Sequence, residues 1–189
     1  CSNTRFSRLM ATVNLLPNVD VSNSPAWTLS TGSDVYDLIN DDHTGFASGD
    51  SRNLSATATG KTCVVQLQDF TEDHSSIDSV QLVTKAGNNG RGQSFELETK
   101  LLPVFGSPYY TETSGTQLAS AGYRTQTYTN RTTYDGSNAW NNIRVNGLKV
   151  SVELDSHSGG TTRFTYTYVI VTYTEPLATD NAVFFGTNF

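Results

Sequence analysis

The strongest constraint on the fold is an alternation of apolar and polar side chains in several segments. It is clearest in Arg163–Tyr173, where Phe164, Tyr166, Tyr168 and Ile170 fall on one face of an extended chain. A period of two residues is typical of a β-strand, because successive side chains of a strand point to opposite faces. Composition agrees, since 27 Thr and only 16% charged residues suit pleated strands better than helical bundles.

The same pattern predicts further strands along the chain. Leu148–Leu154 alternates in the same way, and the Gly- and Ser-rich link 155–162 favours a hairpin in which it pairs with Phe164–Tyr173 as the centre of the core. Other strands are expected at Cys63–Leu67, Ile77–Leu82 and Phe95–Leu101, with a Gly- and Asn-rich turn at 86–92 and an edge strand within Tyr123–Thr133.

These elements predict an all-β chain, built as a single antiparallel β-sandwich of the jelly-roll type. Its 189 residues suit one domain. We expect an N-terminal extension at 1–12, the sandwich at 13–174 and an extended C-terminal arm at 175–189. Val35, Leu38 and Ile39 stand at helical spacing behind Asp34, which predicts a short helical turn capped by this aspartate.

Charge and cysteine content exclude several classes of function. The net charge is −6 and the pI is about 4.9, so the basic surface of a nucleic-acid-binding protein is not expected. No apolar run approaches the ~18 residues that would cross a membrane. Cys63 is expected to be a buried thiol. Cys1 leaves open a surface lipoprotein anchored through this residue.

Motifs for catalysis are scarce in the sequence. His43, His74 and His157 all fall in expected loops, without the spacing of a zinc site. A nucleophile elbow, a phosphate-binding loop and a dinucleotide-binding motif are absent from the sequence. We therefore expect a protein that is not an enzyme and that needs no cofactor, calcium apart.

The calcium hypothesis rests on one acidic segment. Asp34, Asp37, Asp41, Asp42 and Asp50 offer several hard oxygen donors within a short stretch, and calcium prefers such ligands. A solvated turn is the alternative, because the spacing of a known calcium loop is missing.

Two further sets of residues are candidates for contacts. The aromatic side chains Tyr109, Tyr110, Tyr128 and Tyr134 could stack on sugar rings, whereas Trp27 and Trp140 are expected in the core. The apolar tail predicts contacts with another subunit, made by Phe184, Phe185 and Phe189.

Several segments resemble β-sandwich proteins of tailed phages. The quoted stretches are 38–48 (LINDDHTGFAS), 77–87 (IDSVQLVTKAG), 90–97 (GRGQSFEL), 140–152 (WNNIRVNGLKVSV) and 163–173 (RFTYTYVIVTY). The resemblance implies a structural virion protein, such as a capsid decoration or cement protein, a head fibre or a tail-associated subunit. It also implies capsid or tail proteins as partners, a homo-oligomer with a trimer favoured, and an extracellular place on the capsid surface or tail.

A weaker resemblance links 38–48 to discoidin or galactose-binding-like domains, from which the chain departs by lacking paired cysteines at its ends. The main hypothesis from the sequence is thus the virion protein. The alternatives are a carbohydrate-binding module, with calcium as a stabilising ion, and a lipoprotein.

Overall fold

The computed structural model describes residues 9–40, 52–89, 92–118 and 123–176. Its elements are β1 (Met10–Leu15), β2 (Pro17–Asn23), β3 (Thr28–Leu29), α1 (Val35–Ile39), β4 (Leu54–Ala56), β5 (Thr62–Leu67), β6 (Ser76–Asn88), β7 (Ser94–Leu102), β8 (Tyr110–Thr113), β9 (Gln117–Leu118), β10 (Arg124–Thr127), α2 (Asn142–Val145), β11 (Lys149–His157) and β12 (Thr162–Thr174). Within these ranges no helix is long and apolar enough to span a membrane.

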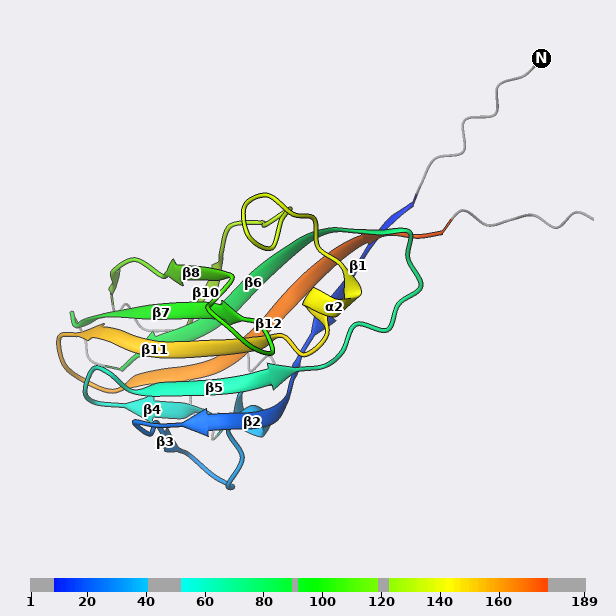
Figure 1. Cartoon of the computed structure of the whole chain (residues 1–189). Coiled ribbons are helices and arrows are strands. Elements are labelled where there is room, and N and C mark those ends of the chain that lie inside the picture. Colours follow the sequence, from blue (N-terminus) through cyan, green and yellow to red (C-terminus); the bar gives the residue numbers. More distant parts are fainter. Residues whose placement is uncertain (1–8, 41–51, 90–91, 119–122, 177–189) are drawn as a thin grey trace, which may run out of the picture.

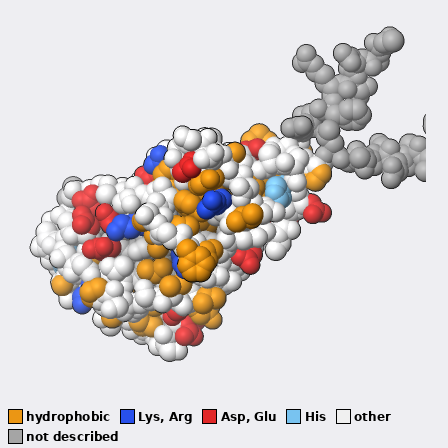
Figure 2. Space-filling view, viewed as in Figure 1, with side chains coloured by type: hydrophobic (Ala, Val, Ile, Leu, Met, Phe, Trp, Pro, Cys, Tyr) orange, Lys and Arg blue, Asp and Glu red, His pale blue; other side chains and the backbone are white. Residues whose placement is uncertain are grey.

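The strands form two six-stranded antiparallel sheets that pack face to face (Figure 1). One sheet, the β12 sheet, runs β10-β6-β12-β4-β3, with β1 also paired to β12. The other, the β11 sheet, runs β2-β5-β11-β7-β8, with β9 also paired to β7. This confirms the predicted jelly-roll sandwich. On the face shown in Figure 2, hydrophobic side chains gather over the β7–β8 loop and α2, and acidic ones at the far end of β7 and β11.

The predicted hairpin of β11 and β12 is wrong. β11 pairs with β5 and β7, whereas β12 pairs with β6, β4 and β1 in the opposite sheet. Alternation predicts each strand correctly but carries no information about its partner. The turn-rich link therefore passes from one sheet to the other, and its Ser158 bonds back to Ser94 at the start of β7.

A bulge in β12 corrects the expected faces of that strand. Phe164 pairs with Ala86 and Tyr166 pairs with Lys85, so Thr165 is an extra residue without a partner. One extra residue reverses the alternation, because the side-chain period is two. Phe164 is consequently buried in the core, whereas Tyr166 and Tyr168 are half-buried on the outer face of the sheet with ring centroids 4.7 Å apart.

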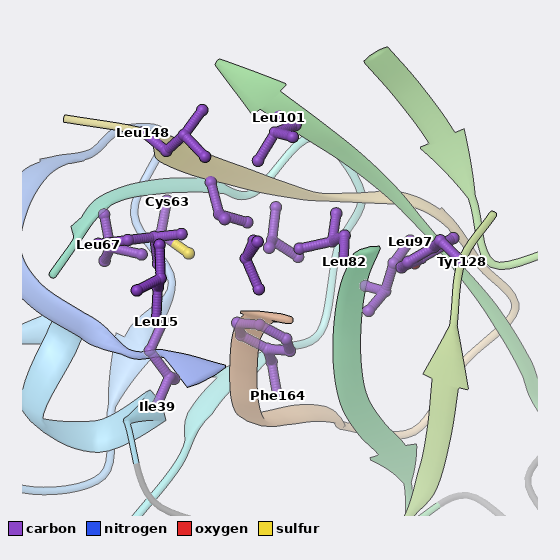
Figure 3. Close-up of a cluster of buried hydrophobic side chains, with 14 of the residues drawn as sticks. Leu15, Ile39, Cys63, Leu67, Leu82, Leu97, Leu101, Tyr128, Leu148 and Phe164 are labelled. Atoms are coloured by element: carbon purple, nitrogen blue, oxygen red, sulfur yellow. The ribbon is translucent and has the colours of Figure 1, made fainter. Parts of the chain in front are cut away.

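The core lies between the two sheets. Figure 3 shows Leu67, Leu97 and Leu148 meeting Leu82 and Phe164 from the other side. The predictions that Trp27, Trp140 and Cys63 are buried are confirmed. Fully burying such apolar side chains contributes about 1.5–3 kcal/mol each.

A buried hydroxyl cluster also joins the sheets. Tyr128 follows the edge strand β10, and its side chain is only 5% exposed. Its hydroxyl lies 3.3 Å from Thr84 Oγ1 on β6 and 3.0 Å from Thr99 Oγ1 on β7. These two strands belong to opposite sheets, so Tyr128 ties the sheets together at this edge. Burial raises the pKa of the Tyr128 phenol.

Helix α1 forms where the sequence predicts it, but its N-terminus is capped by another residue. Asp34 makes no side-chain cap hydrogen bond. Instead Asp20 on β2 accepts hydrogen bonds from the backbone N–H groups of Val35, at 2.7 Å, and Tyr36, at 2.6 Å. A carboxylate there satisfies two N–H groups that have no partner inside the helix. The cap therefore comes from a strand of the β11 sheet.

Removing the Asp20 carboxylate is expected to destabilise the fold by about 1–2 kcal/mol, as loss of a helix cap does. The matched control is Asp34→Ala, which should change the free energy of unfolding very little because Asp34 caps nothing. Urea denaturation of both variants measures the difference. Equal stability of Asp20→Ala and wild type would contradict this account of the cap.

Cys63 makes stability depend on pH in the alkaline range. Its pKa rises from 9.0 to about 12, first because burial disfavours the thiolate and then because of the charge of Asp20. Because the pKa of the thiol is higher in the folded than in the unfolded state, its contribution to the free energy of unfolding is fully present below pH 9. This contribution is lost as the pH rises toward 12. Between about pH 8 and 10.5 the loss should be on the order of 1–2 kcal/mol.

Cys63→Ala removes this contribution while leaving the other titrating groups in place. Its free energy of unfolding should therefore fall less steeply than that of wild type over the same pH interval. Parallel curves for the two proteins would show that the thiol is not the titrating group.

Candidate functional site

The segment between β10 and α2 closes one open edge of the sandwich. It runs beside β6, where Tyr128 N–H donates to Leu82 O at 3.0 Å. Arg131 then exchanges two backbone hydrogen bonds of 2.9 Å with Val80. The facing edge belongs to β8 of the other sheet. This segment and β8 thus border the same gap between the sheets.

Trp140 fills this gap. Its side chain is 3% exposed, and its Nε1–H donates to Arg131 O at 2.8 Å. Three tyrosines surround it: the ring centroids of Tyr109, Tyr134 and Tyr110 lie 5.5, 6.1 and 6.5 Å from that of Trp140. Tyr109 and Tyr134 also contact each other edge to face at 5.5 Å. We call these four residues the Trp140 cluster.

Two arginines lie against the rings of this cluster. The Arg131 guanidinium stands 4.4 Å from the centroid of Tyr110 and pairs with Glu112 on β8. The Arg144 guanidinium stands 4.7 Å from the centroid of Tyr134. A cation over a tyrosine face is attracted by the ring quadrupole. Both contacts hold the tyrosine rings in fixed orientations.

Short-range hydrogen bonds fix the segment that carries Tyr134 and Trp140. Asp135 accepts from the backbone N–H groups of Ser137, at 3.0 Å, and Asn138, at 2.7 Å. These bonds and one from the Asn138 side chain lower the pKa of the Asp135 carboxyl. Asn141 caps α2 by accepting from Arg144 N–H at 3.2 Å. The loop is therefore a set of defined turns.

An exposed apolar tip lies beside the Trp140 cluster. Phe105 is 90% exposed and Ile143 on α2 is 83% exposed. The tip is held by Val104, whose carbonyl accepts from Lys149 Nζ at 3.1 Å and whose side chain lies against Gly147. Figure 2 shows hydrophobic side chains gathered here with basic side chains among them. An exposed aromatic ring on an anchored loop is typical of a binding surface.

The structure brings together three of the four tyrosines that the sequence suggested as glycan contacts. Tyr109, Tyr110 and Tyr134 belong to the Trp140 cluster, whereas Tyr128 lies in the core. Sequence reasoning missed Phe105, Arg131 and Arg144. The sequence did contain an indication for Phe105: an aromatic residue stands in a turn-rich stretch between Pro103 and Pro108, where no core is expected.

The calcium and tail hypotheses fall mostly outside the described residues. The described residues do not include Asp41, Asp42 and Asp50 of the calcium hypothesis or Phe184, Phe185 and Phe189 of the tail hypothesis. Asp34 is exposed, and Asp37 pairs with Arg52 at 2.5 Å. Where the chain is described, no group of three or more His, Cys, Asp or Glu side chains is placed to hold a metal ion.

A pocket at the β9–β10 edge is too small to serve as a ligand site. It is lined by Thr84, Ala86, Phe95, Leu97, Ser114, Gln117, Arg124 and Gln126, and its volume is about 10 Å³. That is room for about one water molecule. The open surface over the Trp140 cluster is consequently the better candidate.

No protein-family model matches the chain, and no curated protein is significantly similar in sequence. Similar solved structures include the CBM36-1 domain of a multidomain xylanase from the hindgut metagenome of Trinervitermes trinervoides, at 11% identity and a TM-score of 0.38, over 85% of this chain and 96% of that one. A carbohydrate-binding module that recognises mannan, TmCBM27, matches at 11% identity and a TM-score of 0.39, over 89% of this chain and 99% of that one. A CBM4 structure matches at 15% identity and a TM-score of 0.35, over 62% and 77% of the two chains.

All three of these structures are carbohydrate-binding modules and none is a phage protein. The prediction of a tailed-phage virion subunit is therefore wrong, because the sandwich features that suggested it also occur in other jelly-roll proteins. The apolar and polar alternation of segments such as 77–87 and 163–173 is what any half-buried strand requires. It therefore carries no information about what the protein binds.

Proposed function

We propose that the chain binds carbohydrate through the surface formed by Phe105, the Trp140 cluster and Arg144. The observation that carries this proposal is the packing of three half-buried tyrosines around one buried tryptophan, beside an exposed phenylalanine. A pyranose ring presents an apolar face of C–H groups and a rim of hydroxyls. Aromatic faces with polar groups at their margin suit both parts of such a ligand.

The polar groups required beside the rings are present. Asn138, Asn141 and Asn142 are exposed on the loop and helix that carry the cluster, together with Asp135. Amide groups donate and accept hydrogen bonds in a plane and a carboxylate accepts them, and sugar hydroxyls can match both. Phe105 at this surface is 90% exposed, so an accessible stretch of a glycan chain suits it better than an enclosed small molecule.

The rings are also pre-ordered, which favours binding. Each tyrosine of the cluster touches Trp140, and Tyr110 also donates a hydrogen bond from its hydroxyl to Thr133 O. Rigid aromatic side chains lose little conformational entropy when a ligand arrives. Binding at this surface therefore needs little rearrangement of the protein.

Phe105→Ala should weaken glycan binding about tenfold or more, which corresponds to about 1.4 kcal/mol. Its exposed ring makes few contacts within the protein, so the melting temperature should stay close to that of wild type. Isothermal titration calorimetry with soluble oligosaccharides, after affinity electrophoresis against a panel of polysaccharides, measures the effect. Tyr168→Ala, on the outer face of the β12 sheet, is the matched aromatic control.

Loss of binding in Tyr168→Ala with retention in Phe105→Ala would move the site to the sheet face. Failure of wild type to bind any glycan of the panel would refute the proposed function.

Gly147 allows a second test that leaves every ring in place. A Cβ atom at Gly147 would lie 2.6 Å from Val104 Cγ2, so Gly147→Ala forces the side chain of Val104, the residue before Phe105, to move. Gly60→Ala is the control, because its φ of 74° nearly equals the 73° of Gly147 but open space surrounds it. Both variants should lose about 1–2 kcal/mol from left-handed strain. Only Gly147→Ala should also weaken glycan binding in calorimetry.

Equal glycan affinity of the two glycine variants would show that the position of the β7–β8 loop does not matter for binding.

A further inference from the structure

The two arginines of the site differ in their electrostatic partners. Arg131 forms an ion pair with Glu112 through its Nη2, and its Nε also donates to Glu112 at 3.0 Å. Within the part of the chain that the structure describes, no carboxylate pairs with Arg144. Asp135, the acidic residue of the same loop, is held by Ser137 and Asn138 in its own turn. Among the described residues, Arg144 thus presents a positive charge without a carboxylate partner.

The surroundings of Arg144 hold its guanidinium in place. One face lies over the ring of Tyr134 at 4.7 Å, and the residue is exposed on α2. The hydroxyl of Tyr109, followed by that of Tyr134, raises the pKa of the guanidinium. Arginine carries five N–H donors in a planar fork, so a group stacked on one ring still has donors at its edge for a ligand.

On the basis of the proposed function, we propose that the ligand is an acidic glycan and that Arg144 binds the carboxylate of a uronic acid residue. A carboxylate matches the guanidinium fork with two parallel hydrogen bonds, which are stronger than bonds between neutral groups. The rings of Phe105 and Tyr109, which belong to the same segment between β7 and β8, would then contact the sugar ring that carries this carboxylate. A neutral sugar would leave the charge of Arg144 unused.

The overall charge of the protein limits how this recognition works. The chain carries a net charge of −6, so it does not attract a polyanion over long distances. Selection of the acidic sugar must come from the short-range contact with Arg144. We therefore expect one arginine to decide the preference, rather than a broad basic surface.

The test compares each acidic polysaccharide with its own carboxyl-reduced form. Polygalacturonate, alginate and glucuronoxylan oligosaccharides serve as probes, and calorimetry measures affinity for the full chain. Wild type should bind at least one acidic probe about tenfold more tightly than the reduced form. Arg144→Gln should lose this preference, and Arg144→Lys, which keeps the charge but not the fork, should retain only part of it. Lys85→Gln, the same charge change on the β12 sheet, should keep the preference.

The outcomes separate this inference from the proposed function. Equal binding of acidic and reduced probes by wild type would overturn the uronate assignment while leaving carbohydrate binding intact. A preference for sulfated glycans over every uronate would also overturn it. A preference that survives in Arg144→Gln would show that another residue reads the carboxylate. Absence of binding to every acidic and neutral glycan would overturn both.

Discussion

The register of β12 governs how the rest of the sandwich packs. This strand bonds to β6 along one edge and to β4 and β1 along the other, so it pairs with three of the other five strands of its sheet. Thr165, which has no partner in the ladder with β6, reverses the alternation of β12 and leaves Phe164 facing the core. The ring centroids of Phe164 and Trp27 lie 6.1 Å apart there. Thr165 at the bulge and Thr167 beyond it bury their hydroxyls by donating to carbonyl groups of β6. A shift by one residue would place Tyr168 in the core and Val169 outside.

Local patterns in the sequence were enough to predict the class of fold and most of the strands. The alternation in 62–67, 94–102 and 149–154 gives strands with their apolar side chains buried, as expected. Strand pairing was not predictable in the same way. The bulge at Thr165 and the separation of β11 from β12 depend on residues far apart in the chain, which periodicity does not report. The same limit explains the cap of α1, since Asp20 precedes the helix by fifteen residues.

The candidate site was only partly predictable for a related physical reason. Tyrosine side chains in loops could be named as candidates from their chemistry. Their assembly depends on Trp140, which joins residues of β8 to the segment after β10. No sequence pattern indicated that Arg131 and Arg144 would lie over tyrosine rings. These contacts arise because the segment crosses the open edge of the sandwich, and that edge exists only once both sheets have formed.

Under the proposed function, the cluster divides stability and ligand recognition between its base and its rim. Trp140 at the base is buried and hydrogen-bonded to Arg131, so its loss would open the edge of the sandwich. Phe105 and Arg144 at the rim are exposed and contribute little to packing. A binding surface built in this way can change its rim residues, and hence its ligand, at small cost to folding, whereas its base is constrained by the core. On this proposal, ligand specificity resides in the side chains that contribute least to the stability of the sandwich.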